Sequence, residues 1–192
     1  AFLRNNPNVL WVASCDGKFD LAFGTWARNM EYLDRTLKDL NARYASYISE
    51  RQIASIIRGE YFLRSYLLNG KRPEGQKSFF GGVPTPIKLD QTDWRILIEL
   101  GKSSRKTSVE IANTVGMSPD AVMQRIKKLE TSGVIRHYNI VPNESRYHYL
   151  HYKILIGFKN ISEEKEQMFV QYCRSTPNIV YIVKALGPWE FE

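Results

Sequence analysis

Residues 89–142 constrain the fold more than any other part of this chain, because three short helical patterns follow one another there and end in an extended run. The first amphipathic pattern begins near Asp90, and the second covers residues 108–115. A tight turn at residues 116–118 leads into the third. Residues 134–141 then alternate and are rich in β-branched side chains, as expected of a strand. Three helices followed by such a strand predict a winged helix.

The third helix carries the strongest local signals. Ser118 is an N-cap candidate, because its hydroxyl can accept a hydrogen bond from a backbone N–H one turn later. Pro119 occupies the first helical position, where its missing N–H costs nothing. Gly133 is placed to end the helix. Helical spacing predicts that the buried face consists of Val122, Ile126 and Leu129.

The opposite face of this helix is small and polar at its start and basic later. Between residues 101 and 138 there are seven Lys or Arg and three acidic residues, which favours a polyanionic partner. We therefore predict binding to double-stranded DNA. The candidate contacts are Ser118, Asp120, Ala121, Gln124, Arg125, Lys127, Lys128 and Arg136.

The segment also resembles a known family. The run LDxxDxxILxxL, followed by EIAxxVGMSPxxVxxRIKKLExxGVIRxY, is similar to the DNA-binding domain of the Lrp/AsnC regulators, and the resemblance covers the whole of residues 89–142. It implies an adjoining βαββαβ effector domain of ferredoxin-like topology, called the RAM domain. It also implies DNA binding as dimers or larger homo-oligomers, and a response to a small amino-acid-like effector.

An internal repeat joins the two flanks of this segment. When the chain is aligned with itself, residues 3–12 match residues 173–182, and at the same offset residues 17–20 match residues 187–190. Arg, Pro, Asn and Gly recur at the same places, and apolar positions keep their character. A match at a fixed period indicates duplication.

The fold class predicted for the whole chain is α+β. Residues 1–67 are expected to be a ββαβ part of one RAM-like domain, and residues 143–192 a βαβ part of a second. Residues 68–88, rich in Gly and Pro, are expected to be a linker. The expected strands are residues 9–15, 19–27, 149–158 and 179–185, together with a long extended segment over residues 51–67, and the expected helices are residues 29–47 and 163–175.

Two arrangements of these flanks remain open. In the first, the chain is part of a longer protein built from two tandem units of about 170 residues, the distance between the two copies of the repeat. Each RAM-like domain would then be only partly contained in this chain. In the second, the flanks form one permuted RAM domain, which is possible because the termini of such folds lie close together. In the linker, Lys71, Arg72 and Lys77 either follow the DNA backbone or are simply solvated.

The repeated turns are candidates for the effector site that the resemblance implies. In the family, the turn after the second RAM strand lies near the effector pocket. The matching residues here are Gly17 and Asp20 in the first copy and Gly187 and Glu190 in the second. A plain hairpin turn is the alternative.

No catalytic residue, metal site or cofactor is predicted. His148 and His151 would point to opposite faces of a strand, and His137 is expected at the surface or in contact with phosphate. The alternative to a regulator is an enzyme similar to the siroheme decarboxylases, which share this architecture; the residues that suggest it are Tyr147, His148, Tyr149, His151 and Tyr152. No membrane span or signal pattern is seen and the two cysteines are isolated, so a cytoplasmic protein is expected.

Overall fold

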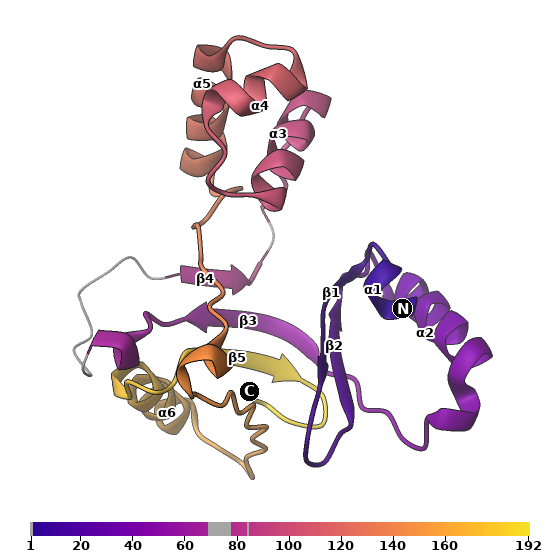
Figure 1. Cartoon of the computed structure of the whole chain (residues 1–192). Coiled ribbons are helices and arrows are strands. Elements are labelled where there is room, and N and C mark those ends of the chain that lie inside the picture. Colours follow the sequence, from indigo (N-terminus) through magenta and orange to yellow (C-terminus); the bar gives the residue numbers. More distant parts are fainter. Residues whose placement is uncertain (1, 69–77, 84) are drawn as a thin grey trace. The chain divides into compact units, whose positions relative to one another are not determined.

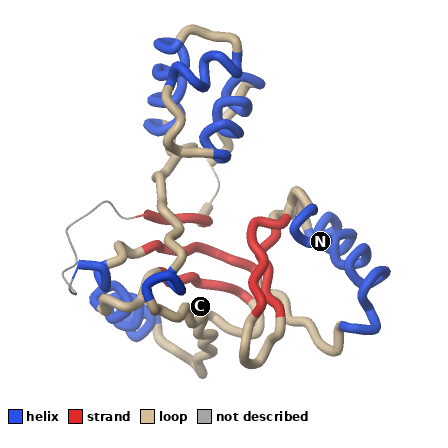
Figure 2. Tube along the Cα trace, viewed as in Figure 1, coloured by secondary structure: helices blue, strands red, loops and turns tan. Residues whose placement is uncertain are grey.

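A computed structural model of the chain describes residues 2–68, 78–83 and 85–192. These residues form an α+β protein that divides into two compact units, residues 1–52 and Ile53–Glu192. Figure 1 labels the helices and strands, and Figure 2 separates helix, strand and loop by colour. Lys71, Arg72 and Lys77, the linker cations considered above, lie outside the described residues.

The first unit is a two-stranded ribbon with one long helix. Its elements are α1 (Phe2–Asn5), β1 (Val9–Ser14), β2 (Leu21–Thr25), α2 (Met30–Tyr44) and the 3₁₀ helix η1 (Ala45–Tyr47). The two strands are antiparallel. The side chain of Asn29 caps α2 by accepting a hydrogen bond from the backbone N–H of Tyr32. The strands and helix predicted here are confirmed to within a few residues.

The first unit buries little. Of residues 2–52, only Thr36 is buried, at 9% exposure, and no apolar side chain is. Leu10 and Leu21 on the ribbon are about half exposed, at 54% and 48%. A lone two-stranded ribbon is marginal in water, and this one leaves large apolar side chains at the surface.

The second unit contains a three-stranded sheet and a helical domain. Its elements are β3 (Ser55–Tyr61), η2 (Ser65–Leu68), β4 (Ser78–Gly81), α3 (Gln91–Lys102), α4 (Ser108–Val115), α5 (Pro119–Thr131), η3 (Glu144–Tyr147), α6 (Glu163–Ser175) and β5 (Tyr181–Leu186). The sheet order is β4-β3-β5, and both pairings are antiparallel. Strand β3 thus bonds to β5, although the whole helical domain lies between them in the sequence.

Two segments pair across the expected domain limits. Residues 53–67, expected to complete the first RAM-like piece, lie in the second unit because β3 pairs with β5. The segment expected to be a linker contains β4, which pairs with β3, and the ring of Phe80 lies 4.9 Å from that of Tyr61. The pairing with β3 and the packing of Phe80 stabilise a strand here, although nearby glycines disfavour one.

Two predicted strands are absent. Residues 134–141 form no strand, so the strand predicted for the wing is absent: the residues suit a pleated sheet, but no strand that the structure describes pairs with them. Residues 149–158 contain one isolated bridge, between Ile156 and Phe191. Ile156 exchanges backbone hydrogen bonds with Glu190 and Phe191, and the strand predicted over 149–158 does not form.

Two apolar cores lie in the second unit. One joins α3, α4 and α5 and contains Ile96, Ile111, Ala112, Val115, Val122 and Leu129. The other joins α6 to β5 and contains Cys173, Ile182 and Phe191. Phe158 and Phe169 pack against this second core, with their rings 5.3 Å apart.

The sequence repeat recurs in the backbone. The N–H of Cys15 donates to the carbonyl of Asp20 at 2.9 Å, and in the second copy the N–H of Ala185 donates to the carbonyl of Glu190 at 2.8 Å. Gly17 and Gly187 lie between these groups, with φ of 149° and 150°. The two units therefore contain the same strand and turn.

Candidate nucleic-acid interface

Side-chain caps fix where the three helices of residues 91–131 begin. Asp90 and Asp93 form a capping box at α3, in which each side chain accepts a hydrogen bond from the backbone N–H of the other. Thr107 and Glu110 form the same box at α4. Such boxes satisfy backbone donors that a helix leaves unpaired, so the helix starts are set by local sequence.

The turn between α4 and α5 and the start of α5 are as predicted. Gly116 ends α4 in the left-handed conformation, with φ of 75°, and its N–H donates to the carbonyl of Ala112 at 2.9 Å. The hydroxyl of Ser118 then accepts from the N–H of Ala121 at 3.3 Å, and Pro119 opens the helix. The pair α4–α5 is a helix-turn-helix.

Helix α5 buries one face and exposes the other. Val122 is fully buried, Leu129 is 3% exposed, and Ile126 is partly buried against the same core. The predicted helical phase is confirmed. On the opposite side Asp120, Gln124, Lys127 and Lys128 are exposed, and Ala121 is half-buried.

Arg125 has partners that sequence reasoning missed. One of its Nη atoms lies 2.6 Å from a carboxylate oxygen of Asp90 and 2.7 Å from one of Asp93. The backbone N–H of Asp93 and then the guanidinium hold the pKa of Asp90 below its usual value, and the two carboxylates raise the pKa of Arg125. Arg125 therefore ties α5 to the start of α3.

Arg136 is also engaged within the protein. Its guanidinium donates to the carbonyl oxygens of Phe79 at 3.3 Å and Gly81 at 3.2 Å, on β4. Two residues later the chain contacts α5, where the hydroxyl of Tyr138 donates to the carboxylate of Glu130 at 2.8 Å. The segment expected to be a wing thus links α5 to the sheet.

The basic side chains of residues 101–138 now divide into two groups. Lys102 and Lys106 both bind Glu99 and lower the pKa of its carboxyl to about 2. With Arg125 and Arg136 also engaged, three cations remain exposed and make no ion pair with any residue that the structure describes. These are Arg105, Lys127 and Lys128. Arg105 was not among the candidate contacts; its place just before the Thr107 cap, in an exposed loop, was the available signal.

The two candidate effector turns differ in their side chains. Asp20 is exposed, whereas a carboxylate oxygen of Glu190 accepts a hydrogen bond from the backbone N–H of Phe158. The glycines differ as well. A Cβ added at Gly187 would lie 2.7 Å from the carbonyl oxygen of Ile53, and one added at Gly17 would meet no described atom within 4 Å.

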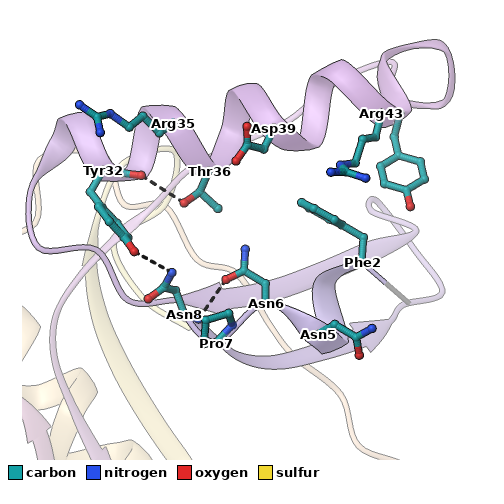
Figure 3. Close-up of a pocket in the computed structure, with 11 residues that line it drawn as sticks. Phe2, Asn5, Asn6, Pro7, Asn8, Tyr32, Arg35, Thr36, Asp39 and Arg43 are labelled. Carbon is teal, nitrogen blue, oxygen red and sulfur yellow. Dashed lines mark hydrogen bonds between the residues drawn. The ribbon is translucent and has the colours of Figure 1, made fainter.

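A pocket of about 690 Å³ lies in the first unit, between α2 and the turn before β1 (Figure 3). At one end the hydroxyl of Tyr32 accepts a hydrogen bond from the side-chain amide of Asn8 at 3.1 Å. Asp39 and Arg43 line it from α2. Its lining does not include the Gly17–Asp20 turn.

Several of the histidines and tyrosines considered for other chemistry contact aromatic rings, whereas Tyr152 is 76% exposed. The ring of His137 is half-buried and lies edge-on to Tyr61 at 5.8 Å, so its predicted surface position is wrong. Tyr149 contacts Tyr66 and Tyr147, at ring distances of 5.0 and 5.5 Å. Among residues 2–68, 78–83 and 85–192, no three His, Cys, Asp or Glu side chains gather as metal ligands would, and no helix is long and apolar enough to span a membrane.

Comparison with known proteins points to one family. A family model described as a winged helix-turn-helix DNA-binding domain matches residues 89–136. A leucine-responsive regulatory protein of Rhizobium meliloti is 37% identical over 92 residues, which are 47% of this chain and 59% of that protein. The HTH-type transcriptional regulator LrpC of Bacillus subtilis is 30% identical over 103 residues, which are 53% of this chain and 69% of LrpC.

A third relative comes from another organism. An uncharacterized HTH-type transcriptional regulator of Pyrococcus furiosus is 40% identical over 57 residues, which are 30% of this chain and 37% of that protein. Comparison with solved structures gives no significant match. These relatives are named as regulators, and none of them supports the tetrapyrrole enzyme considered from the sequence. With its helix-turn-helix, its capped helices and this similarity to LrpC, the chain belongs to the Lrp/AsnC family of transcription regulators.

Proposed function

We propose that this protein binds double-stranded DNA sequence-specifically and places α5 in the major groove. The observation that carries the proposal is the exposed face of α5, where Gln124 lies one turn before Lys127 and Lys128. Small and polar side chains allow a helix to approach base edges, and lysines neutralise phosphates. The relatives' names as transcriptional regulators support the same role.

The residues of α5 would then differ in role according to their position. Ala121 and Gln124 face base edges near the start of the helix. Lys127, Lys128 and the loop residue Arg105 contact phosphates. Arg125 acts as a positioning residue, because its guanidinium is already bound by two carboxylates.

A selection from a random DNA library, made with the whole chain, tests this function. The selected site would then be titrated with two variants over a range of salt concentrations. Lys128→Ala should weaken binding to all sequences. It should also make the negative slope of the logarithm of the binding constant against the logarithm of salt concentration shallower by about one unit. Gln124→Ala should instead relax discrimination at one base pair, by about 1–3 kcal/mol.

Lys165→Ala, at an exposed position on α6, is the matched control and should leave both quantities unchanged. Failure to enrich any DNA sequence would refute the function. If the two α5 variants had the same effect on specificity and salt slope, the assignment of contacts would be wrong.

We further propose that the protein acts as a dimer or larger homo-oligomer on pseudo-palindromic sites. The support is the first unit, in which no described apolar side chain is buried. Two-fold pairing would present α5 twice, with half-sites about one helical turn apart or a multiple of it. Light scattering measures the oligomeric state, and a well-folded monomer would remove the reason to expect palindromic sites. Such a regulator would work in the cytoplasm.

A small amino-acid effector, if it binds at a repeated turn, would use the first one. Asp20 is exposed and available to an ammonium group, whereas the carboxylate of Glu190 is held by Phe158. Leucine is the first ligand to test, because two relatives are named leucine-responsive. Leucine should raise the Tm of the chain, and Asp20→Asn should abolish that rise while Glu190→Gln should not.

A further inference from the structure

A second cavity lies within the larger unit, between the sheet and the segment that follows α5. Its volume is about 480 Å³, which is within the range typical of small-molecule sites. The described residues that line it come from the end of β3 and the residues just after it, the start of β4, the end of α5 and residues 135–139. This second cavity shares no described residue with the pocket of Figure 3 or with the two repeated turns.

Two buried polar atoms belong to residues that line this second cavity. They are Oγ of Ser78 and Nδ1 of His137, and neither is hydrogen-bonded to any residue that the structure describes. Buried polar atoms of native proteins nearly always have a hydrogen-bond partner. Two such atoms in one cavity therefore indicate that a polar group binds there.

The two atoms belong to side chains on either side of Tyr61. In the pairing of β3 with β4, Tyr61 lies opposite Ser78, and directly opposed side chains of antiparallel strands lie on the same face of the sheet. The ring of His137 lies edge-on to that of Tyr61, with ring centroids 5.8 Å apart. Ser78 and His137 thus meet beside one aromatic ring, where a single ligand group can bond to both.

The charge of the lining favours an anion. Arg136 lines the second cavity, and one of its Nη atoms donates to the carbonyl oxygens of Phe79 and Gly81. These acceptors are neutral, and Arg136 makes no ion pair with any residue that the structure describes, so its charge is not balanced there. The acidic lining residue, Glu130, is exposed and accepts a hydrogen bond from Tyr138. A hydroxyl, an imidazole N–H and a guanidinium are donors suited to an oxyanion.

Apolar side chains in the lining favour an organic anion over an inorganic one. Phe62 and Ile135 are half-buried there, and the rings of Tyr61 and Tyr138 lie in the same lining. Small-molecule sites combine such apolar walls with a few polar groups that fix the orientation of the ligand. Inorganic phosphate would leave these walls without a contact, whereas the body of an organic acid would cover them.

We propose that the second cavity binds a small organic acid, which has one carboxylate on an apolar body. The carboxylate accepts hydrogen bonds from Ser78 and from the Nδ1–H tautomer of His137, beside the charge of Arg136. The apolar body packs against Tyr61 and Phe62. The bound acid would hold the segment after α5 against β3 and β4.

The test uses the whole chain, isotope-labelled for nuclear magnetic resonance, and two probe acids, benzoate and 4-methylpentanoate. At least one acid should shift the amide signals of residues 78 and 135–138 with saturation and leave those of residues 9–25 in place. The neutral analogues benzamide and 4-methylpentanamide should bind at least about tenfold more weakly, because they lack the charge. No DNA is present, so the result does not depend on the proposed DNA binding.

Two variants remove the unpartnered atoms and retain much of the side-chain shape. Ser78→Ala and His137→Phe should each raise the Kd of the acid about tenfold or more. The Tm without ligand should stay the same or rise, because each variant removes a polar atom that is unpaired in the free protein. Ser104→Ala and His148→Phe, at exposed positions, are the matched controls and should leave the Kd unchanged.

Any of three results would overturn the proposal. The first is that neither acid shifts the signals of residues 78 and 135–138. The second is that inorganic phosphate or the neutral amides bind there as tightly as the acids, since the recognised group would then not be an organic carboxylate. The third is a lower Tm of Ser78→Ala and His137→Phe with an unchanged Kd, which would mean that these side chains hold an ordered water as part of the fold.

Discussion

An Nη atom of Arg125 lies 2.7 Å from a carboxylate oxygen of Asp93, so α5 is joined to α3 through a residue that is 5% exposed. Asp93 also completes the cap of its own helix. One carboxylate therefore fixes both where α3 begins and how α5 lies against it. An acidic residue in the first turn of a helix thus sets the placement of a different helix.

Arg125→Ala should lower the Tm of the helical domain. The change leaves the Asp93 carboxylate without its charged partner, at a cost of about 1–3 kcal/mol, and 1 kcal/mol corresponds to about 4–8 °C in a small domain. Calorimetry measures the shift. Lys127→Ala, two residues away and exposed, should leave the Tm unchanged while reducing the DNA salt slope by about one unit. An unaltered Tm in Arg125→Ala would mean that the ion pair does not hold the helices together.

Arg136→Ala separates the two roles considered for this residue. If Arg136 mainly caps β4, the variant should exchange amide hydrogens of β3 and β4 faster, while the salt slope of DNA binding stays the same. Exchange mass spectrometry and salt titration measure these two quantities. A salt slope reduced by about one unit, with unchanged exchange, would support the phosphate contact predicted from the sequence.

Acid should destabilise the helical domain partly through Glu99. Lys102 and Lys106 lower the pKa of its carboxyl in the folded state from 4.5 to about 2. A lowered pKa stabilises the fold above the unfolded value, and this stability is lost as the pH falls through the folded value. The free energy of unfolding should therefore fall between pH 4.5 and about 2, and less steeply in Glu99→Gln. Glu164→Gln, exposed on α6, should follow the unaltered protein; equal slopes for all three would refute the assignment.

Two isoleucines on α3 provide a matched test of the core. Ile96 is fully buried and Ile98 is 54% exposed. Ile96→Ala should reduce the free energy of unfolding by about 2–5 kcal/mol, because it removes packed methyl groups and leaves a cavity. Ile98→Ala should change it by less than about 0.5 kcal/mol. Urea denaturation compares them, and similar costs for both variants would show that the helix faces the core differently.

Local signals were enough to predict the helices. The cap at Ser118, the proline after it and the glycine at position 133 define α5, and α6 has the predicted limits, Glu163–Ser175. The buried face of α5 followed from spacing alone. Helix starts and faces depend on neighbours within one or two turns, which a single sequence displays directly.

Pairings between distant segments were not predictable in the same way. The residues of β4 were expected to be linker, and the extended residues 134–141 were expected to be a strand. Both predictions failed because a strand forms only where a second strand pairs with it, and the local sequence does not show that second strand. The same holds for Arg125, whose carboxylate partners lie 32 and 35 residues earlier in the chain. Helical phase placed Arg125 correctly at the edge of the exposed face of α5 but could not reveal what it binds.

The close approach of Gly187 to Ile53 also bears on how the two copies of the repeat can diverge. At Gly187 any side chain would collide with the backbone that leads into β3, so mutation there is constrained by a strand from a distant part of the sequence. A side chain at Gly17 would meet no atom of the described residues within 4 Å, so among them its own backbone angle is the constraint. Over generations the first turn is therefore free to acquire new side chains and new ligands, while the second is kept as it is by the sheet it supports.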